Sequence, residues 1–300
     1  MKILVIGGTN IDINATSINE IVRKDSNIGN IEISIGGVAK NIAENLARLD
    51  LDVSFLTILG NDHYAEVAIK YLKSLNLNLI YGKSKKYPTS IYLAVFDQNH
   101  DLEIGINDMK ATDELNKSFI QKYVNFKLYD LVVIDSNLCS ETLEYIANYC
   151  DKPIYAESIS VNKVLRLKPF LSKFTAIKCN KLEALALTDT KNHKDIESMM
   201  KDLASQGVKE VYVTDGGNGS YLYKNNQIHH KLPYPVNIIN TTGAGDAFYS
   251  GVIYAKALNK QELVYGNALA KITLESNKSN NPNLNRELIE RVVENHEIRN

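Results

Sequence analysis

Residues 240–248 have the sequence Asn-Thr-Thr-Gly-Ala-Gly-Asp-Ala-Phe, and a mostly apolar segment of helical character continues to residue 257. The glycines leave the backbone of this turn open, and its amide groups point together at the start of the helix. Because the helix dipole adds positive charge there, such a turn is typical of an anion-binding site. Asp246 lies within the turn, where a carboxylate can accept a proton from an attacking hydroxyl during phosphoryl transfer. The alternative is a glycine turn in which Asp246 only caps the helix.

Two more glycine pairs occur, one directly after a predicted strand and one directly before a predicted helix. Gly7-Gly-Thr-Asn-Ile-Asp12 comes after a β-branched run at 3–6, and Gly36-Gly-Val-Ala-Lys-Asn41 opens a helical pattern at 38–49. Taken alone, each pair is a turn with a cap. Together the three turns place Asp12, Asn41 and Asp246 at strand-to-helix edges, which is where a doubly wound fold binds its ligands.

Short apolar runs alternate with amphipathic segments along the rest of the chain. Strands are predicted at 53–59, 131–134, 154–156, 175–178 and 211–214, and helices at 64–75, 141–149, 182–187, 195–206 and 247–257. Repeated strand–helix–strand units predict an α/β fold whose mostly parallel sheet has helices on both faces. The extended segments at about 13–35 and 91–106 fit poorly in a parallel sheet and predict a small separate β-layer.

The composition excludes several classes of protein. The chain has 300 residues, of which 44% are hydrophobic and 23% charged, which excludes a disordered, collagen-like or coiled-coil chain. A formal net charge of −1 argues against nucleic acid or an acidic membrane as a partner. Three scattered cysteines without a CxxC pair favour a reducing compartment. Without a run of about 18 apolar residues or a secretory signal, we expect a cytoplasmic protein with no membrane partner.

These motifs together resemble the ribokinase-like (PfkB) family of carbohydrate and nucleoside kinases. The resemblance extends over essentially the whole chain, and the signatures at 36–41 and 241–248 carry it. It implies one three-layer α/β/α domain over residues 1–300 with a mostly parallel sheet, and a small β-sheet lid inserted at about 13–35 and 91–106. It also implies ATP-dependent transfer of the γ-phosphate to a hydroxymethyl group of a sugar. The lid accounts for the two extended segments.

The resemblance also implies roles for individual residues. Asp246 matches the catalytic base of the family, and the anion hole is matched by Gly243, Ala244 and Gly245. The positions that hold the sugar hydroxyls are matched by Asp12, Gly37 and Asn41. Asn180-Lys-Leu-Glu183 matches the NxxE motif that organises Mg²⁺ and its waters, with Glu183 acting through water; its local alternative is a capping box at a helix start. The loop on the ATP side is matched by Thr214, Gly216 and Gly217, with Asn180 beside it.

Within the family, the amino-acid sequence of several stretches is most similar to that of the pseudouridine kinases. These stretches include 36–49, 107–109, 135–138, 178–184 and 240–248. Asn107, Asp108 and Asn137 are then expected to face the sugar or the base. Ribokinase, fructokinase and adenosine/inosine kinase stay open as alternatives, as does a non-catalytic sugar- or nucleotide-binding regulator. The expected partners are a small nucleoside or sugar and ATP, and a homodimer through the lid sheets is compatible with the resemblance.

Two positions depart from the family pattern. Many relatives have Asp where this chain has Asn240, and that carboxylate helps to bind a monovalent cation beside the anion hole. An amide oxygen carries no net charge, so we expect only weak stimulation by K⁺. Glu157 lies in Tyr-Ala-Glu-Ser, where Ala-Asp-Pro is more usual.

Overall fold

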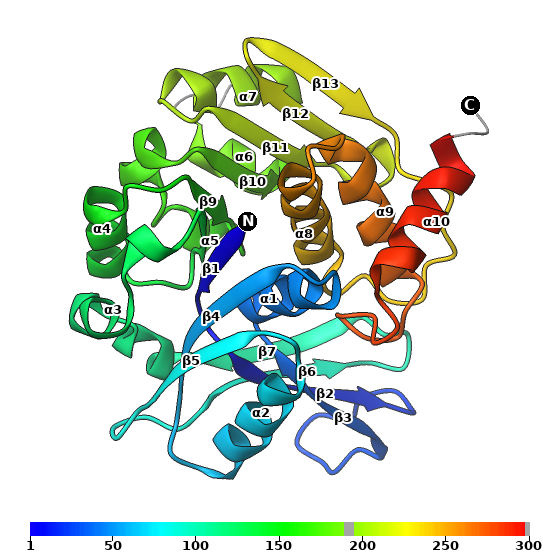
Figure 1. Ribbon diagram of the computed structural model, residues 1–300. Coiled ribbons are helices and arrows are strands. Elements are labelled where there is room, and N and C mark those ends of the chain that lie inside the picture. The colour runs from blue at the N-terminus through cyan, green and yellow to red at the C-terminus, as the bar shows by residue number, and fades with distance from the viewer. Residues whose placement is uncertain (189–194, 298–300) are drawn as a thin grey trace.

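The computed structural model describes residues 1–188 and 195–297, and within them a nine-stranded sheet forms the centre of the molecule (Figure 1). Its order is β13-β12-β11-β10-β9-β8-β1-β4-β5. The strands are β1 (Lys2–Ile6), β4 (Asp52–Leu59), β5 (Asn78–Lys83), β8 (Leu131–Asp135), β9 (Ile154–Glu157), β10 (Ala176–Asn180), β11 (Glu210–Thr214), β12 (Ser220–Lys224) and β13 (Gln227–Lys231). The pairs from β11 to β5 are parallel, and β12 and β13 join antiparallel at one edge. The predicted α/β class is therefore confirmed.

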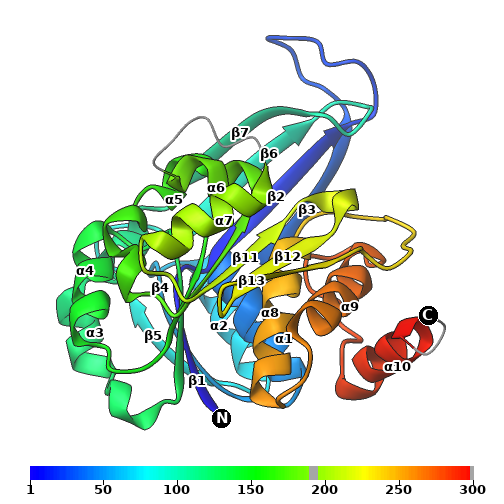
Figure 2. The same cartoon turned by 90° about the horizontal axis from the view of Figure 1, so that it is seen from above.

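Helices cover both faces of this sheet (Figures 1 and 2). One face carries α1 (Val38–Arg48), α8 (Ala244–Ala257) and α9 (Glu262–Leu274), with α10 (Arg286–Glu297) packed on α9 and α2 (His63–Ser74) beside α1. The other carries α3 (Lys117–Tyr123), α4 (Ser140–Tyr149), α5 (Val161–Val164), α6 (Lys181–Leu187) and α7 (Ile196–Ser205). Short 3₁₀ turns occur at Lys110–Glu114, Phe126–Leu128, Lys168–Lys173 and Gly216–Asn218.

Alternation of side chains along the strands builds a core on each face. Ile3 and Val5 of β1 pack with α1 and α8, whereas Leu4 and Ile6 pack with the helices of the opposite face. A strand that is covered on both faces needs a nearly continuous run of apolar residues. The sequences of β1 and β4 are such runs.

A second sheet of four strands stands apart from the large one, in the order β3-β2-β6-β7 (Figure 2). It consists of β2 (Asn10–Ser17), β3 (Gly29–Gly36), β6 (Ser90–Phe96) and β7 (Leu102–Asp108). The β2–β6 pair is parallel and the two outer pairs are antiparallel. The predicted separate β-layer is confirmed, while its action as a lid stays a prediction. Pairing puts Asp12, Ser34, Tyr92 and Asn107 in one row, and Ile13, Ile33, Leu93 and Ile106 in the next row.

Some elements differ from the sequence-based prediction. Helix α8 begins at Ala244, before the predicted 247, because Gly243 takes a left-handed conformation (φ 81°) that starts the helix directly after the turn. Helix α9 has no clear amphipathic period, since it is buried on most of its surface. In residues 1–188 and 195–297, no helix combines the length and the apolar character needed to cross a bilayer.

Candidate active site

Asp246 and Asn41 meet where the N-termini of α8 and α1 converge. Nδ2 of Asn41 donates a hydrogen bond of 2.7 Å to Oδ2 of Asp246, and both side chains are buried. Each helix follows a glycine with a positive φ, Gly243 before α8 and Gly37 (φ 112°) before α1. A side chain at Gly243 would collide with the carbonyl of Ser279, so the turn requires glycine there. The structure thus brings together two predicted site residues from opposite ends of the chain.

The surroundings of Asp246 act on its pKa in opposing directions. Burial raises the pKa of Asp246, and the nearby carboxylate of Asp12 acts the same way. The hydrogen bond from Asn41 and the charges of Lys178 and Lys40 lower it, but the net effect is a raised pKa. A carboxylate shifted upward from its ordinary range is a stronger proton acceptor, which suits a general base.

Asp12 projects from β2 into a cavity of about 650 Å³ that is also lined by Lys40, Glu44 and Asn240. Its Oδ1 accepts a hydrogen bond of 2.5 Å from Nδ2 of Asn10. A side chain at Gly36 would occupy the space of the Asp12 carboxylate, so the glycine pair makes room for it. Burial raises the pKa of Asp12.

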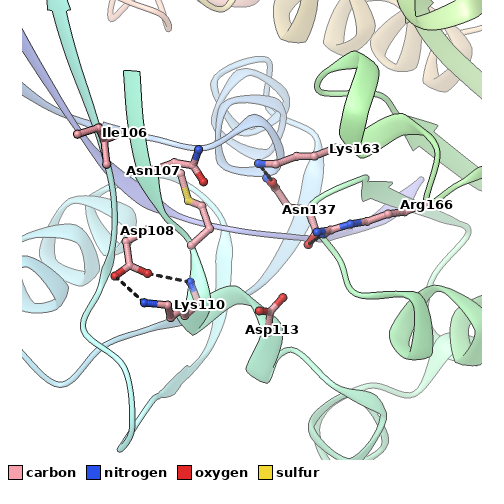
Figure 3. A pocket seen from close by; sticks show the side chains of 9 residues that line it. Ile106, Asn107, Asp108, Lys110, Asp113, Asn137, Lys163 and Arg166 are labelled. Atoms are coloured by element: carbon pink, nitrogen blue, oxygen red, sulfur yellow. Dashed lines mark hydrogen bonds and ion pairs between the residues drawn. The ribbon is translucent and has the colours of Figure 1, made fainter. Parts of the chain in front are cut away.

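Asn107, Asp108 and Asn137 line a second cavity, of about 430 Å³, between the end of β7 and the segment after β8 (Figure 3). Two cations that the sequence analysis missed, Lys163 and Arg166, lie on its other side. Nζ of Lys163 donates to Oδ1 of Asn137 at 2.7 Å, and Nη1 of Arg166 donates to the Asn137 carbonyl at 3.0 Å. Amide, carboxylate and cationic groups therefore converge here, whereas Asp12 lies in the other cavity.

Asp135, at the end of β8, is a further residue that the sequence analysis did not single out. Its carboxylate is fully buried and accepts hydrogen bonds from the backbone N–H groups of Ala39 (3.3 Å) and Asn137 (2.9 Å). Burial raises the pKa of Asp135 to about 6. The signal in the sequence is an acidic residue that ends an apolar strand. Asp135 ties the start of α1 to the segment that carries Asn137.

Three of the residues predicted to face ATP line a third cavity, of about 320 Å³, whereas the fourth, Asn180, is not among its lining residues. Thr214, Gly216 and Gly217 lie there with Ala244 and Gly245, and its apolar wall includes Val236, Ile238, Phe248 and Leu274. A Cβ at Gly216 or Gly217 would meet no atom within 4 Å, so these glycines border open space. An apolar slot that ends at a helix N-terminus fits a heterocycle joined to phosphates.

Asn180 and Glu183 form the capping box that was the local alternative for this motif. Oδ1 of Asn180 accepts from the Glu183 N–H at 2.9 Å, and Glu183 Oε2 accepts from the Asn180 N–H at 2.7 Å. Oε2 also accepts from the Ser158 hydroxyl at 2.5 Å. The described residues hold no group of three or more His, Cys, Asp or Glu side chains suited to a metal. A lone carboxylate fits Mg²⁺, which keeps several waters and takes its other ligands from phosphates.

Asn240 does not fit a monovalent cation site well. Its Oδ1 accepts from the Thr242 N–H at 2.9 Å, and its Nδ2 donates to the Asn277 carbonyl at 3.4 Å. The amide spans the two loops by itself and directs an N–H group at a carbonyl that would otherwise be available to a cation.

The chain is similar to known kinases over most of its length. Residues 1–286 match the model of the pfkB family of carbohydrate kinases. Pseudouridine kinase of Escherichia coli K12 is 28% identical over 310 aligned residues, covering 99% of this chain and 98% of that protein. Guanosine-inosine kinase of Exiguobacterium acetylicum is 29% identical over 262 residues, covering 84% and 86% of the two chains.

Solved structures show the same architecture. A carbohydrate kinase from Agrobacterium tumefaciens is 27% identical with a TM-score of 0.84, covering 98% of this chain and 97% of its own. Ribokinase from Thermotoga maritima, at 21% identity, has a TM-score of 0.83 and covers 98% and 99% of the two chains. The predicted ribokinase-like fold is confirmed, and the chain belongs to the pfkB family of carbohydrate kinases.

Proposed function

We propose that the protein is an ATP-dependent kinase that phosphorylates the ribose 5′-hydroxyl of pseudouridine, giving pseudouridine 5′-phosphate and ADP. The observation that carries the proposal is the buried Asp246–Asn41 pair at two helix N-termini. Gly245, next to Asp246, lines the apolar cavity suited to ATP. Asp12 and Lys40, whose charges act on Asp246, line the cavity on the other side. The base therefore lies between two candidate ligand sites.

The chemistry follows from the position of the base. The 5′-oxygen attacks the γ-phosphorus, and its proton goes to Asp246. The bond from phosphorus to the bridging oxygen breaks, and ADP leaves with the electron pair. The Asn41 hydrogen bond occupies Oδ2 and leaves Oδ1 for the hydroxyl. Asn41 thus orients the carboxylate for proton transfer.

The turn at 243–245 supplies the complementary positive field. The first amides of α8 have no partner within the helix, and they face the charge that gathers on the transferring group. When bound, Mg²⁺ shields the phosphate charge from the incoming oxygen. Glu183 would hold it through water, and Asn180 positions Glu183 through the capping box.

Two observations support pseudouridine as the acceptor. A pseudouridine kinase is similar over nearly the full length of this chain. The cavity of Figure 3 offers the amide groups of Asn107 and Asn137 and the carboxylate of Asp108, which can serve the carbonyl and N–H groups of a uracil ring. The guanosine-inosine kinase similarity favours a purine nucleoside as the second candidate. A non-catalytic regulator has no need of the base at Asp246.

The experiment is an assay of ADP release with magnesium ATP and a panel of acceptors. We expect the highest kcat/KM for pseudouridine, with uridine as the matched control because it differs only in the glycosidic linkage. Inosine, guanosine, adenosine, ribose and fructose test the alternatives. A higher kcat/KM for any of these would contradict the pseudouridine assignment, and no turnover with any acceptor would contradict a kinase.

A further inference from the structure

Lys178 and Glu157 form a buried ion pair behind the glycine turn. They are partners in the β9–β10 register, and Lys178 Nζ lies 2.7 Å from Glu157 Oε1. The exposed fractions of the two side chains are 6% and 1%. The neighbours Ile177 and Cys179 pack in the core on the opposite face of the sheet, so Lys178 points toward α8. None of the steps described above uses this pair.

The ammonium group lies against the first turn of α8. A Cβ built on Gly245 would be 2.7 Å from Lys178 Nζ, so the absence of a side chain there makes room for the charge. A helix N-terminus carries positive partial charge, which makes it an unfavourable place for a cation. Burial adds a further cost, because a charge removed from water must be compensated. A cation in this place therefore needs anions around it.

The anions that act on Lys178 come from three elements: they are Glu157 of β9, Asp246 of α8 and Glu183 of α6. Asp246 is in turn influenced by the charges of Lys40 of α1 and Asp12 of β2. Among the described residues, Glu157 Oε1 is the one hydrogen-bond acceptor of the Lys178 ammonium group, which carries three protons. The other oxygen, Glu157 Oε2, is buried without a hydrogen-bond partner. Hydrogen bonding within the cluster is therefore incomplete, which is unusual for a pair that serves packing alone.

We propose that Lys178 is a positioning residue for phosphoryl transfer. Glu157 holds the positive charge of Lys178 in place behind Gly245. There the charge stabilises the ionised carboxylate of Asp246 and the anion bound at the turn. The inference rests on the proposed kinase function. It predicts that the charge of Lys178 contributes mainly to turnover, because the charge of the phosphoryl group is redistributed during transfer. The competing explanation is a buried pair that only ties β9 to β10.

The chain offers a matched control at the other end of the same helix. Lys256 in the last turn of α8 pairs with Glu210 of β11 at 2.6 Å, far along the helix from the glycine turn. Lys178→Met removes the lysine of an ion pair between β9 and β10 beneath α8. Lys256→Met removes the lysine of an ion pair between α8 and β11. We expect Lys178→Met to lower kcat about 100-fold, as loss of one anion-stabilising group does. KM for the nucleoside should stay within about twofold, and Lys256→Met should keep kcat within about twofold.

The pH profile separates charge from packing. The acid limb of kcat/KM reports protonation of the free-enzyme base, here Asp246. Loss of the positive charge in Lys178→Met should move this limb to higher pH. Loss of the negative charge in Glu157→Gln, which keeps the side-chain shape, should move it to lower pH. A purely structural pair would not produce opposite shifts, and Glu157→Gln decides the question if Lys178→Met does not fold.

The acceptor is the one that wild-type protein phosphorylates best in the panel above. If the wild-type protein is active, two results would overturn this inference while leaving the proposed function intact. One is a Lys178→Met variant that keeps more than half of kcat, and the other is an acid limb that does not move in the variants. Wild-type protein that turns over no acceptor overturns the proposed function and this inference with it. A lower kcat with opposite limb shifts supports both.

Discussion

Asn41 Nδ2 lies 2.7 Å from Asp246 Oδ2, although 205 residues separate the two in the chain. The contact exists because α1 and α8 pack side by side on one face of the large sheet, with their N-termini at the same edge. Glycines at 37 and 243 start both helices and keep that edge free of side chains. Its consequence is a carboxylate that is buried, oriented and next to the first backbone amides of α8.

Replacing the base tests the central assignment. We expect Asp246→Asn to lower kcat by about 10²–10⁴-fold while ATP binding is largely kept, because the amide cannot accept the proton. Steady-state kinetics and ATP titration measure the two effects. Asp195→Asn is the control, since Asp195 caps the N-terminus of α7 on the opposite face of the large sheet. Near-wild-type turnover in Asp246→Asn would show that another group is the base.

Asp135 predicts a pH dependence of stability. Its pKa in the folded protein is raised to about 6 from an ordinary value of 3.8 because the carboxyl group is buried. The folded state therefore holds this proton more tightly than the unfolded state. The stabilisation is fully present below pH 3.8 and is lost as the pH rises through about 6. Urea unfolding of wild type and Asp135→Asn across this range should show the wild type losing stability relative to the variant, and parallel curves would contradict this prediction.

The small sheet is predicted to close over bound nucleoside. Its row of Asp12, Ser34, Tyr92 and Asn107 includes two residues, Asp12 and Asn107, that are expected to meet the substrate. Closure excludes water, which would otherwise accept the phosphoryl group. We expect amide hydrogen exchange in β3 and β7 to slow at saturating nucleoside, with β11 as the unchanged reference. Exchange that stays the same in β3 and β7 would count against a moving lid.

Potassium should stimulate the enzyme only weakly. The Asn240 amide already bridges Thr242 and Asn277, so position 240 offers a cation no carboxylate. Asn240→Asp should strengthen the stimulation, because it restores the charge and removes the N–H that faces the Asn277 carbonyl. Activity is measured against K⁺ at constant ionic strength, with tetramethylammonium as the replacement cation. Strong activation that saturates at low K⁺ in the wild type would refute the argument.

The apolar side of the small sheet predicts self-association. Ile31, Ile33, Ile104 and Ile106 are 54–68% exposed on its two outer strands. Such a continuous aliphatic face is rare on a monomer, and a second copy offers the same face for a symmetric contact. Light scattering should give a dimer, and Ile33→Glu with Ile104→Glu should shift it to monomer. Leu128→Glu, at an exposed site elsewhere, is the control, and a monomeric wild type would contradict this prediction.

Much of the fold could be predicted because its signals are local. The run at 3–6, the helix at 38–49 and the turn at 240–248 combine strand, helix and glycine patterns within a few residues. Helix α9 escaped prediction because a helix buried all round lacks an amphipathic period. Lys163 escaped prediction because a lysine in a short polar segment looks like any solvated charge until α5 packs beside Asn137.

The sequence by itself determined the strand–helix alternation and the glycine turns, and it singled out Asp246 as the candidate base, since each depends on residues that are neighbours in the chain. Only the tertiary structure decided that Asn41 orients Asp246, that Lys178 lies behind Gly245 with Glu157, and that Asp12 and Asn137 line different cavities. The physical reason is that strand order and helix packing set these contacts. They join segments far apart in sequence, and burial then gives ordinary charges their unusual strength.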